Sequence, residues 1–116
     1  MGIQVVSSAM AAPECIQSSA QLVDELGKSE DWIVRRTGVR HRRCGNAAWD
    51  SPELSAQAAR MATEAKPRPD LLIYAGGVQR QALPDTSVFV ARELGLEGTP
   101  CFSVNASCLS FMVALK

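Results

Sequence analysis

The residues best suited to chemistry lie around Cys108, near the end of the chain. Residues 100–104 are typical of a strand, small polar residues follow, and the apolar segment 109–115 is typical of a helix. This spacing places Cys108 at a strand-to-helix junction, beside unpaired backbone N–H groups and the positive end of the helix dipole. Such surroundings favour the thiolate, the nucleophilic form of cysteine. The alternative is a buried small hydrophobic residue, since free cysteines are usually buried.

The composition indicates one globular domain. The chain has 116 residues, of which 47% are hydrophobic and 21% charged, enough to build a core. The 12 basic residues balance the 12 acidic ones, so binding to nucleic acid or to a membrane surface is not indicated. The basic run 40–43 has no interleaved aromatic residues and has acidic neighbours in sequence, so we interpret it as a solvated face.

The cysteines predict neither a metal site nor a disulfide framework. Cys15, Cys44, Cys101 and Cys108 have no C-x-x-C spacing, and His41 is the single histidine. Free thiols fit a reducing compartment. The N-terminus lacks the basic flank of a signal peptide, and no apolar run is long enough to cross a bilayer. We therefore expect a cytoplasmic protein without a membrane span.

Turn and capping residues divide the chain into alternating strands and helices. Strands are predicted at Ile3–Ala12, with its loop, at Leu71–Ala75, buried on both faces, and at 100–104. Helices are predicted from Ser18 or Ser19 to Gly27, from Ser29 to Gly38, from Ser51–Pro52 to about Ala65, from Pro84–Asp85 to Leu94, and after Cys108. Residues 39–44 are expected to be extended and exposed. The alternation predicts an α/β layer with mostly parallel strands.

Four stretches match one family in its order and close to its spacing. They are Asp-Trp-Ile-Val-Arg-Arg-Thr-Gly-Val at 31–39, the strand 70–74, Ala-Leu-Pro at 82–84, and Val-Asn-Ala-Ser-Cys at 104–108 with Phe111. In these the chain resembles the N-terminal part of β-ketoacyl-acyl carrier protein synthase III, a condensing enzyme of the thiolase superfamily. The resemblance covers essentially all of residues 1–116. It implies the N-terminal half of a thiolase-like α/β fold, a mostly parallel sheet flanked by helices, with the C-terminal half absent from this chain.

The resemblance also implies roles for individual residues. Cys108 would be the acyl-accepting nucleophile. Trp32 would stack on the adenine of coenzyme A and Arg36 would reach its phosphate; residues four apart share a helical face, and these side chains suit those ligands. The alternatives are a half-buried packing residue for Trp32 and a helix C-terminal charge for Arg36. Leu83 would reach across a dimer interface into the neighbour's acyl tunnel, or else be a leucine of the loop core.

The implied reaction is acyl transfer followed by condensation, in fatty acid biosynthesis. An acyl-CoA acylates Cys108, and a malonyl thioester on acyl carrier protein then condenses with the acyl group and loses CO2. Coenzyme A enters as the substrate thioester and no resident cofactor is implied. The family's catalytic His and Asn lie in the C-terminal half, so that half is expected as an obligatory partner, the assembly as a homodimer, and the 116 residues alone as inactive.

Two substitutions depart from the family pattern. Ser110 replaces a glycine, and Lys28 stands where a threonine commonly contributes to coenzyme A binding. The pattern Cys-Leu-small-Phe at 108–111 is similar to the one found in the head-to-head condensing enzymes. An acyltransferase or head-to-head relative, and a non-catalytic subunit or fragment, therefore remain as alternatives.

Overall fold

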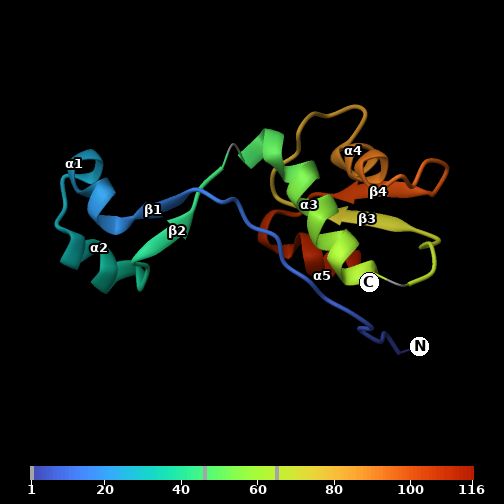
Figure 1. The fold of residues 1–116 in the computed structure, drawn as a ribbon, viewed down its shortest axis with the longest axis horizontal. Coiled ribbons are helices and arrows are strands. Elements are labelled where there is room, and N and C mark those ends of the chain that lie inside the picture. Colours follow the sequence, from blue (N-terminus) through green and yellow to red (C-terminus); the bar gives the residue numbers. More distant parts are fainter. Residues whose placement is uncertain (1, 46, 65) are drawn as a thin grey trace. The chain divides into compact units, whose positions relative to one another are not determined.

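The computed structural model describes residues 2–45, 47–64 and 66–116, and the chain divides into two compact units (Figure 1). We name Ala12–Gly45 the hairpin unit, and Met1–Ala11 together with Asn46–Lys116 the sheet unit. The assignment of residues 1–116 to one segment of a thiolase-like domain stays a prediction.

The hairpin unit joins a small antiparallel sheet to short helices. Strand β1 (Ile16–Ser18) pairs with β2 (His41–Arg43), with Gln17 opposite Arg42. Between them lie the 3-10 helix η1 (Ser19–Leu22), α1 (Val23–Leu26) and α2 (Glu30–Thr37). Leu22 and Ile33 are buried, so the inner face of α2 is held by apolar packing.

The helix boundaries predicted in the hairpin unit are confirmed. Ser18 caps η1 through a reciprocal capping box with Gln21, and the Ser29 hydroxyl accepts from the Trp32 N–H at the start of α2. Gly27 and Gly38 end the helices with φ of 59° and 72°. These left-handed conformations suit glycine, which has no Cβ to clash.

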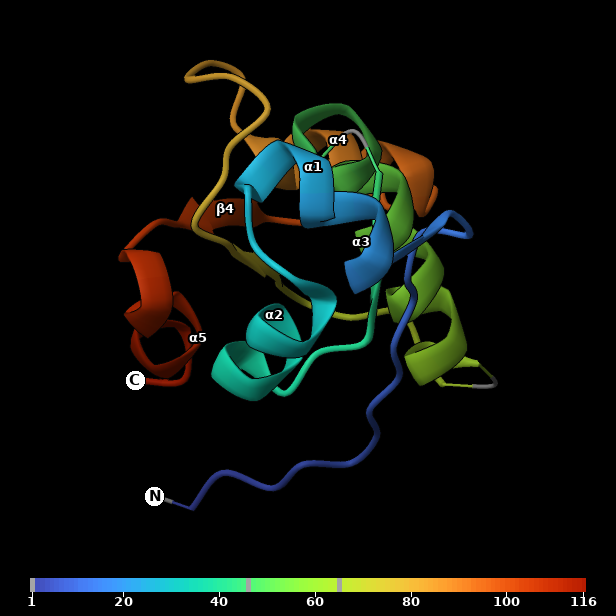
Figure 2. The ribbon, with the colours of Figure 1, turned by 90° about the vertical axis from the view of Figure 1, so that its left-hand side faces the viewer.

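The sheet unit contains a parallel two-stranded sheet covered by helices. Strand β3 (Leu72–Ala75) pairs with β4 (Cys101–Val104), which confirms the predicted parallel arrangement. The helical elements are α3 (Ala47–Thr63), α4 (Thr86–Glu93), the 3-10 helix η2 (Ser107–Leu109) and α5 (Ser110–Ala114). Helices α4 and α5 each contact both strands, and α3 packs on α4. Figures 1 and 2 show α4 and α5 on opposite sides of the sheet.

Three predictions about these elements are wrong. The strand predicted within Ile3–Ala12 is absent, because a strand needs a hydrogen-bonding neighbour and no described residue pairs with this segment. Helix α3 begins at Ala47, so Pro52 lies inside it rather than at its first position. Its side chain is fully buried, and the helix continues past it although proline has no N–H for a backbone hydrogen bond. Strand β3 is half-buried instead of buried on both faces.

Asp85 ties the start of α4 to β4. Its Oδ1 accepts the Ser87 N–H at 3.0 Å and the Ser87 hydroxyl at 2.5 Å, and its Oδ2 accepts the Ser103 N–H at 3.0 Å. Burial raises the pKa of the Asp85 carboxyl, but the hydrogen bonds from Ser87 and Ser103 outweigh it and leave the pKa below its ordinary value of 3.8. The charged form is therefore the one that the fold stabilises.

We expect Asp85→Asn to lower the free energy of unfolding by about 1 kcal/mol at pH 7, although asparagine caps helices as well as aspartate does. Stability is lost for two reasons. The negative charge is removed, and the Ser103 N–H loses its acceptor, because the nitrogen of the asparagine amide cannot accept a hydrogen bond. Because the folded pKa is lowered, this stabilisation is complete above the unfolded pKa near 4 and is lost as the pH falls through the folded value. Urea unfolding at pH 7 and pH 3 measures the difference, with the exposed Asp70→Asn as control. If the difference in free energy of unfolding between wild type and Asp85→Asn is the same at pH 3 as at pH 7, the charge is not responsible.

Candidate functional site

Cys108 lies in η2, directly between β4 and α5. The strand-to-helix junction predicted from the sequence is thus confirmed. Its thiol is free and the residue is exposed in the described chain. The alternative interpretation of Cys108 as a buried small hydrophobic residue is therefore wrong for these residues.

The backbone just before Cys108 is in an uncommon conformation. Ser107 has φ of 50°, the left-handed region that residues with a Cβ seldom adopt. The Asn105 side-chain oxygen accepts the Ser107 N–H at 3.4 Å, and the Leu109 N–H bonds the Ala106 carbonyl at 3.0 Å. A sharp turn therefore separates the strand from the cysteine.

Ser110 holds this turn from the following helix. Its side chain is 3% exposed. Its hydroxyl donates to the Ser107 carbonyl at 2.7 Å and accepts the Ala106 N–H at 2.9 Å. The sequence showed Ser110 only as a departure from the family's glycine, because a serine in an apolar helical segment does not indicate which backbone groups it bonds.

The loop after β3 passes close to the same turn. The Gly76 N–H bonds the Val104 carbonyl at 3.1 Å, and a Cβ on Gly77 would lie 3.8 Å from the Ser107 Cα. A Cβ on Gly76 would fall 2.6 Å from the Tyr74 ring, whose hydroxyl lies 2.6 Å from the Ser51 hydroxyl. A side chain at position 76 would therefore displace the Tyr74 ring and its hydrogen bond with Ser51.

Trp32, Arg36 and Lys28 are together on one surface of the hairpin unit. The Trp32 side chain is 41% exposed. The Arg36 guanidinium carbon lies 5.8 Å and the Lys28 Nζ 5.5 Å from the centroid of its ring, within the range of cation–π attraction. An exposed indole flanked by two cations suits a ligand with a flat ring and phosphates. The resemblance placed Lys28 where a threonine commonly contributes to coenzyme A binding, but its position over the indole was not foreseen, because Lys28 precedes the helix and the sequence does not show where its side chain turns.

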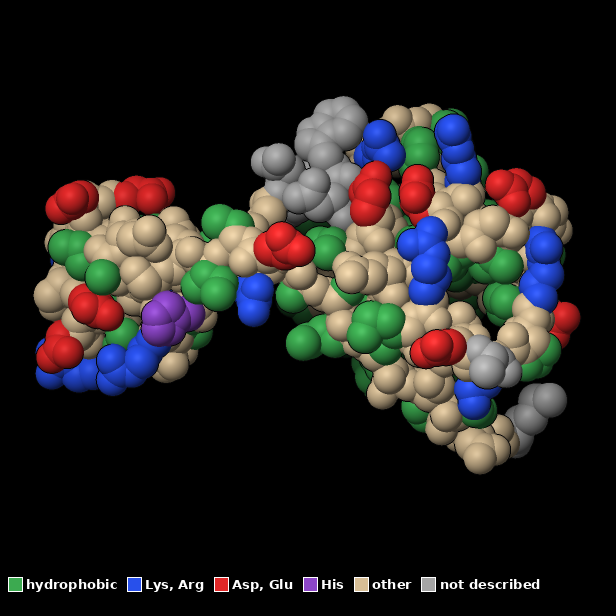
Figure 3. Space-filling view, in the orientation of Figure 1, with side chains coloured by type: hydrophobic (Ala, Val, Ile, Leu, Met, Phe, Trp, Pro, Cys, Tyr) green, Lys and Arg blue, Asp and Glu red, His purple; other side chains and the backbone are tan. Residues whose placement is uncertain are grey.

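Basic side chains continue along this unit. Figure 3 shows Lys and Arg along one edge, beside the single histidine. The Trp32 side chain is 41% exposed, so the alternative of a half-buried packing residue stands beside the binding role. Arg36 lies in the last turn of α2, so its interpretation as a helix C-terminal charge also holds.

Leu83 is 86% exposed, in the loop between β3 and α4. It does not pack in the core of that loop, so the loop-core interpretation is wrong for the described chain. Its dimer contact stays a prediction.

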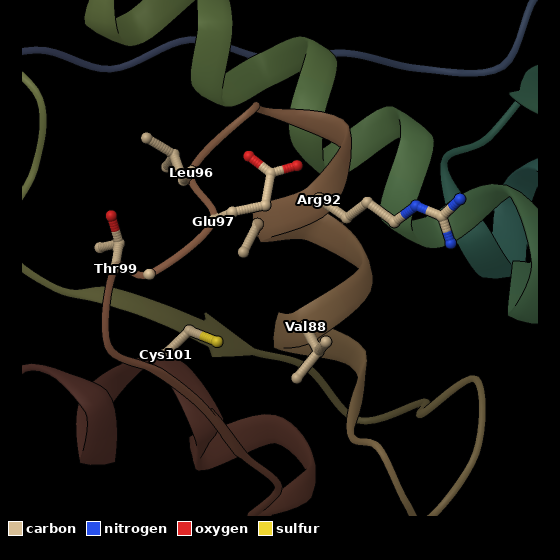
Figure 4. Close-up of a pocket in the computed structure, with 8 residues that line it drawn as sticks. Val88, Arg92, Leu96, Glu97, Thr99 and Cys101 are labelled. Atoms are coloured by element: carbon tan, nitrogen blue, oxygen red, sulfur yellow. The ribbon is translucent and has the colours of Figure 1, made fainter.

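A separate hollow of about 420 Å³ lies between α4 and the start of β4. Figure 4 shows the Cys101 thiol and Val88 facing it, and the Arg92 side chain extending away. Cys108 does not line it. The hollow therefore adds no group to the junction at Cys108.

The described residues contain neither a metal-binding cluster nor a membrane-spanning helix. No group of three or more His, Cys, Asp or Glu side chains there could hold a metal ion. No helix among the same residues is both long and apolar enough to cross a membrane.

The fold is that of part of a thiolase-like condensing enzyme. The chain superposes on 3-oxoacyl-(acyl carrier protein) synthase III from Pseudomonas aeruginosa PAO1 with a TM-score of 0.83 and 33% identity, over 94% of this chain and 34% of that one. It superposes on the priming β-ketosynthase of the R1128 polyketide pathway with a TM-score of 0.87 and 27% identity, over 97% of this chain and 35% of that one.

The sequence is similar to curated proteins of the same kind. It is 34% identical over 112 residues to the β-ketoacyl-(acyl-carrier-protein) synthase III of Novosphingobium aromaticivorans, which is 93% of this chain and 34% of that protein. No family model matches the chain. The predicted resemblance is confirmed, and the chain spans about a third of the length of the curated relatives that it matches.

Proposed function

We propose that this chain supplies the acyl-accepting part of a condensing enzyme similar to β-ketoacyl-acyl carrier protein synthase III. The observation that carries the proposal is Cys108, exposed at a sharply turned strand-to-helix junction in a chain with this fold. The likeness to relatives of that name, over more than nine-tenths of the chain, supports the same conclusion.

In the first half-reaction the Cys108 thiolate attacks the carbonyl carbon of an acyl-CoA thioester. The new thioester bond forms on the cysteine sulfur and coenzyme A leaves as its thiolate. We assign the nucleotide end of coenzyme A to the group of Trp32, Arg36 and Lys28. Its exposed indole offers a stacking surface and its cations suit phosphates.

In the second half-reaction a malonyl thioester on acyl carrier protein loses CO2. The resulting carbanion attacks the acyl carbon, the bond to Cys108 breaks, and a β-ketoacyl thioester is released. Groups that stabilise the enolate charge are needed, and we assign them to a C-terminal portion of the enzyme. The single histidine of this chain, His41, lies in β2 among arginines of the hairpin unit, and we do not assign it this role.

The surface of α5 supports the need for that portion. Phe111, Met112 and Val113 on α5 are exposed, as are Leu109 before it and Leu115 after it. Contiguous exposed apolar side chains of this kind mark surfaces that another part of a protein covers. We therefore propose the C-terminal portion as an obligatory partner, and a homodimer contacted by Leu83. We place the reaction in the cytoplasm, in keeping with four free cysteines among the described residues.

Intact-mass spectrometry of the purified protein, with any companion polypeptide, tests the first half-reaction. After incubation with a panel of acyl-CoAs, we expect the mass of one acyl group to be added to this chain, and the panel reveals the preferred acyl length. Added malonyl-acyl carrier protein should then discharge the acyl group with release of CO2. A protein that takes up no acyl group from any member of the panel would contradict the proposal.

The Cys-Leu-Ser-Phe sequence at 108–111 favours a head-to-head condensing enzyme as the second candidate, and an acyltransferase of the same fold would share its first step. Such an enzyme forms the same acyl-Cys108 but passes the acyl group to a different acceptor. An acyl-enzyme that discharges onto a second acyl-CoA, a hydroxyl or an amine without release of CO2 from a malonyl thioester would select it.

A further inference from the structure

We infer that Ser110 is a positioning residue for Cys108, an inference that rests on the proposed function. The side chain is almost completely buried, yet it bonds neither the thiol nor the rest of α5, the helix that Ser110 begins. Both of its hydrogen bonds go back to the two residues before the cysteine.

The hydroxyl is well matched to the two groups it meets. Its proton goes to the Ser107 carbonyl oxygen and a lone pair accepts the Ala106 N–H. The backbone N–H of Ser110 donates to the same Ser107 carbonyl. The Ser110 side chain thus forms hydrogen bonds with both residue 106 and residue 107. Alanine or glycine at position 110 has no hydroxyl and can form neither of them.

These bonds fall where the backbone needs support. Ser107 carries φ of 50° although it has a Cβ, and such a conformation persists only where surrounding contacts hold it. The Asn105 side chain offers one long bond of 3.4 Å to the Ser107 N–H. Beside the backbone bond from the Leu109 N–H to the Ala106 carbonyl, Ser110 supplies two shorter bonds to residues 106 and 107, so it is the main side-chain support of the turn.

The position of Cys108 follows from this turn. Cys108 is the next residue after Ser107, so a change in the Ser107 backbone angles redirects the whole cysteine. A nucleophile acts well only when it is held at the angle and distance of attack. Ser110 therefore acts on the acylation step through the backbone, without touching the substrate.

The acylation rate of Cys108 by acetyl-CoA, followed by rapid quench and intact mass on the purified protein with any companion polypeptide, tests this role. We expect Ser110→Ala to be acylated about tenfold more slowly at saturating acetyl-CoA, because the turn loses two hydrogen bonds. The concentration for half-maximal rate should stay at its wild-type value, because Ser110 contacts no substrate. Ser87→Ala, which also removes a buried hydroxyl and its hydrogen bond, is the matched control and should keep the wild-type rate.

A second substitution separates positioning from general stability. Glycine adopts positive φ without cost, so Ser107→Gly combined with Ser110→Ala should recover most of the lost rate. A wild-type rate in Ser110→Ala, an equal loss in Ser87→Ala, or no recovery in the double variant would overturn the inference. If Ser110→Ala does not fold, Ser110→Gly removes the same hydroxyl and is read in the same way. A wild-type protein that takes up no acetyl group contradicts the proposed function and this inference with it, whereas a normal wild type beside an unaffected Ser110→Ala contradicts the inference alone.

Discussion

Cys108→Ala is expected to abolish covalent uptake of acyl groups from acyl-CoA, a loss of at least about 10³-fold in rate. Alanine has no nucleophilic atom, and none of the other cysteines stands at this turn: Cys15 and Cys44 belong to the hairpin unit, and Cys101 is in β4. Alanine is also close in size to cysteine and Cys108 is exposed, so the fold should tolerate the change. Intact mass after incubation with acyl-CoA measures the loss.

Cys15→Ala is the matched control for this experiment. Cys15 is likewise free and exposed, so a small alkylating reagent should modify both thiols in the wild type. Acyl-CoA should modify Cys108 alone, and Cys15→Ala should therefore gain the full acyl mass. If Cys108→Ala still gains one acyl group, or if the label divides between Cys15 and Cys108, the thiol is not a selected nucleophile and the non-catalytic alternative is favoured.

Local signals in the sequence were enough to predict most helix ends. Gly27, Gly38 and Gly95 each follow a helix and take positive φ, and Asp85 caps α4 as the sequence indicated. Such caps depend on residues within one turn, so the sequence contains the information that decides them. The parallel pairing of β3 with β4 followed from the intervening helix, because parallel strands need a crossover connection.

Pairings between distant residues were predicted less well. Strand β1 was missed, because it has three residues without alternation and exists through its register with β2. The reverse error was made at residues 3–12, where β-branched residues indicated a strand that has no neighbour among the described residues. A strand is a property of two segments, and the pattern of one segment does not show whether the other is present.

The position of the candidate site followed from the sequence, and its geometry only in part. The position of Cys108 between strand and helix followed from the sequence, but the left-handed Ser107 did not, since serine carries no preference for positive φ. The hydrogen bonds of Ser110 follow from that turn and were equally hidden. The grouping of Trp32 with Arg36 was foreseen from their spacing of four, whereas Lys28 joins them from outside the helix.

Trp32→Ala is expected to raise the KM for acyl-CoA about tenfold or more, because stacking contributes about 1–3 kcal/mol per base by alanine substitution. The maximal rate of Cys108 acylation should change little, since the indole would hold the nucleotide and not the thioester. Arg36→Ala should also raise KM, with an effect that shrinks as salt is added, because a phosphate contact at an exposed residue is screened. Arg35→Ala is the matched control: it removes the same charge from the same last turn of α2.

A truncated substrate decides whether these residues act on the nucleotide. An acyl-pantetheine thioester carries the same reacting group without adenine or the ribose phosphate. The wild type should use acyl-pantetheine less well than acyl-CoA. Trp32→Ala should use acyl-pantetheine as well as the wild type does, because this substrate has no adenine for the indole to bind. Trp32→Phe keeps an aromatic face and should retain most of the preference for acyl-CoA over acyl-pantetheine. If Trp32→Ala slows both substrates equally, the indole stabilises the hairpin unit and the nucleotide binds elsewhere.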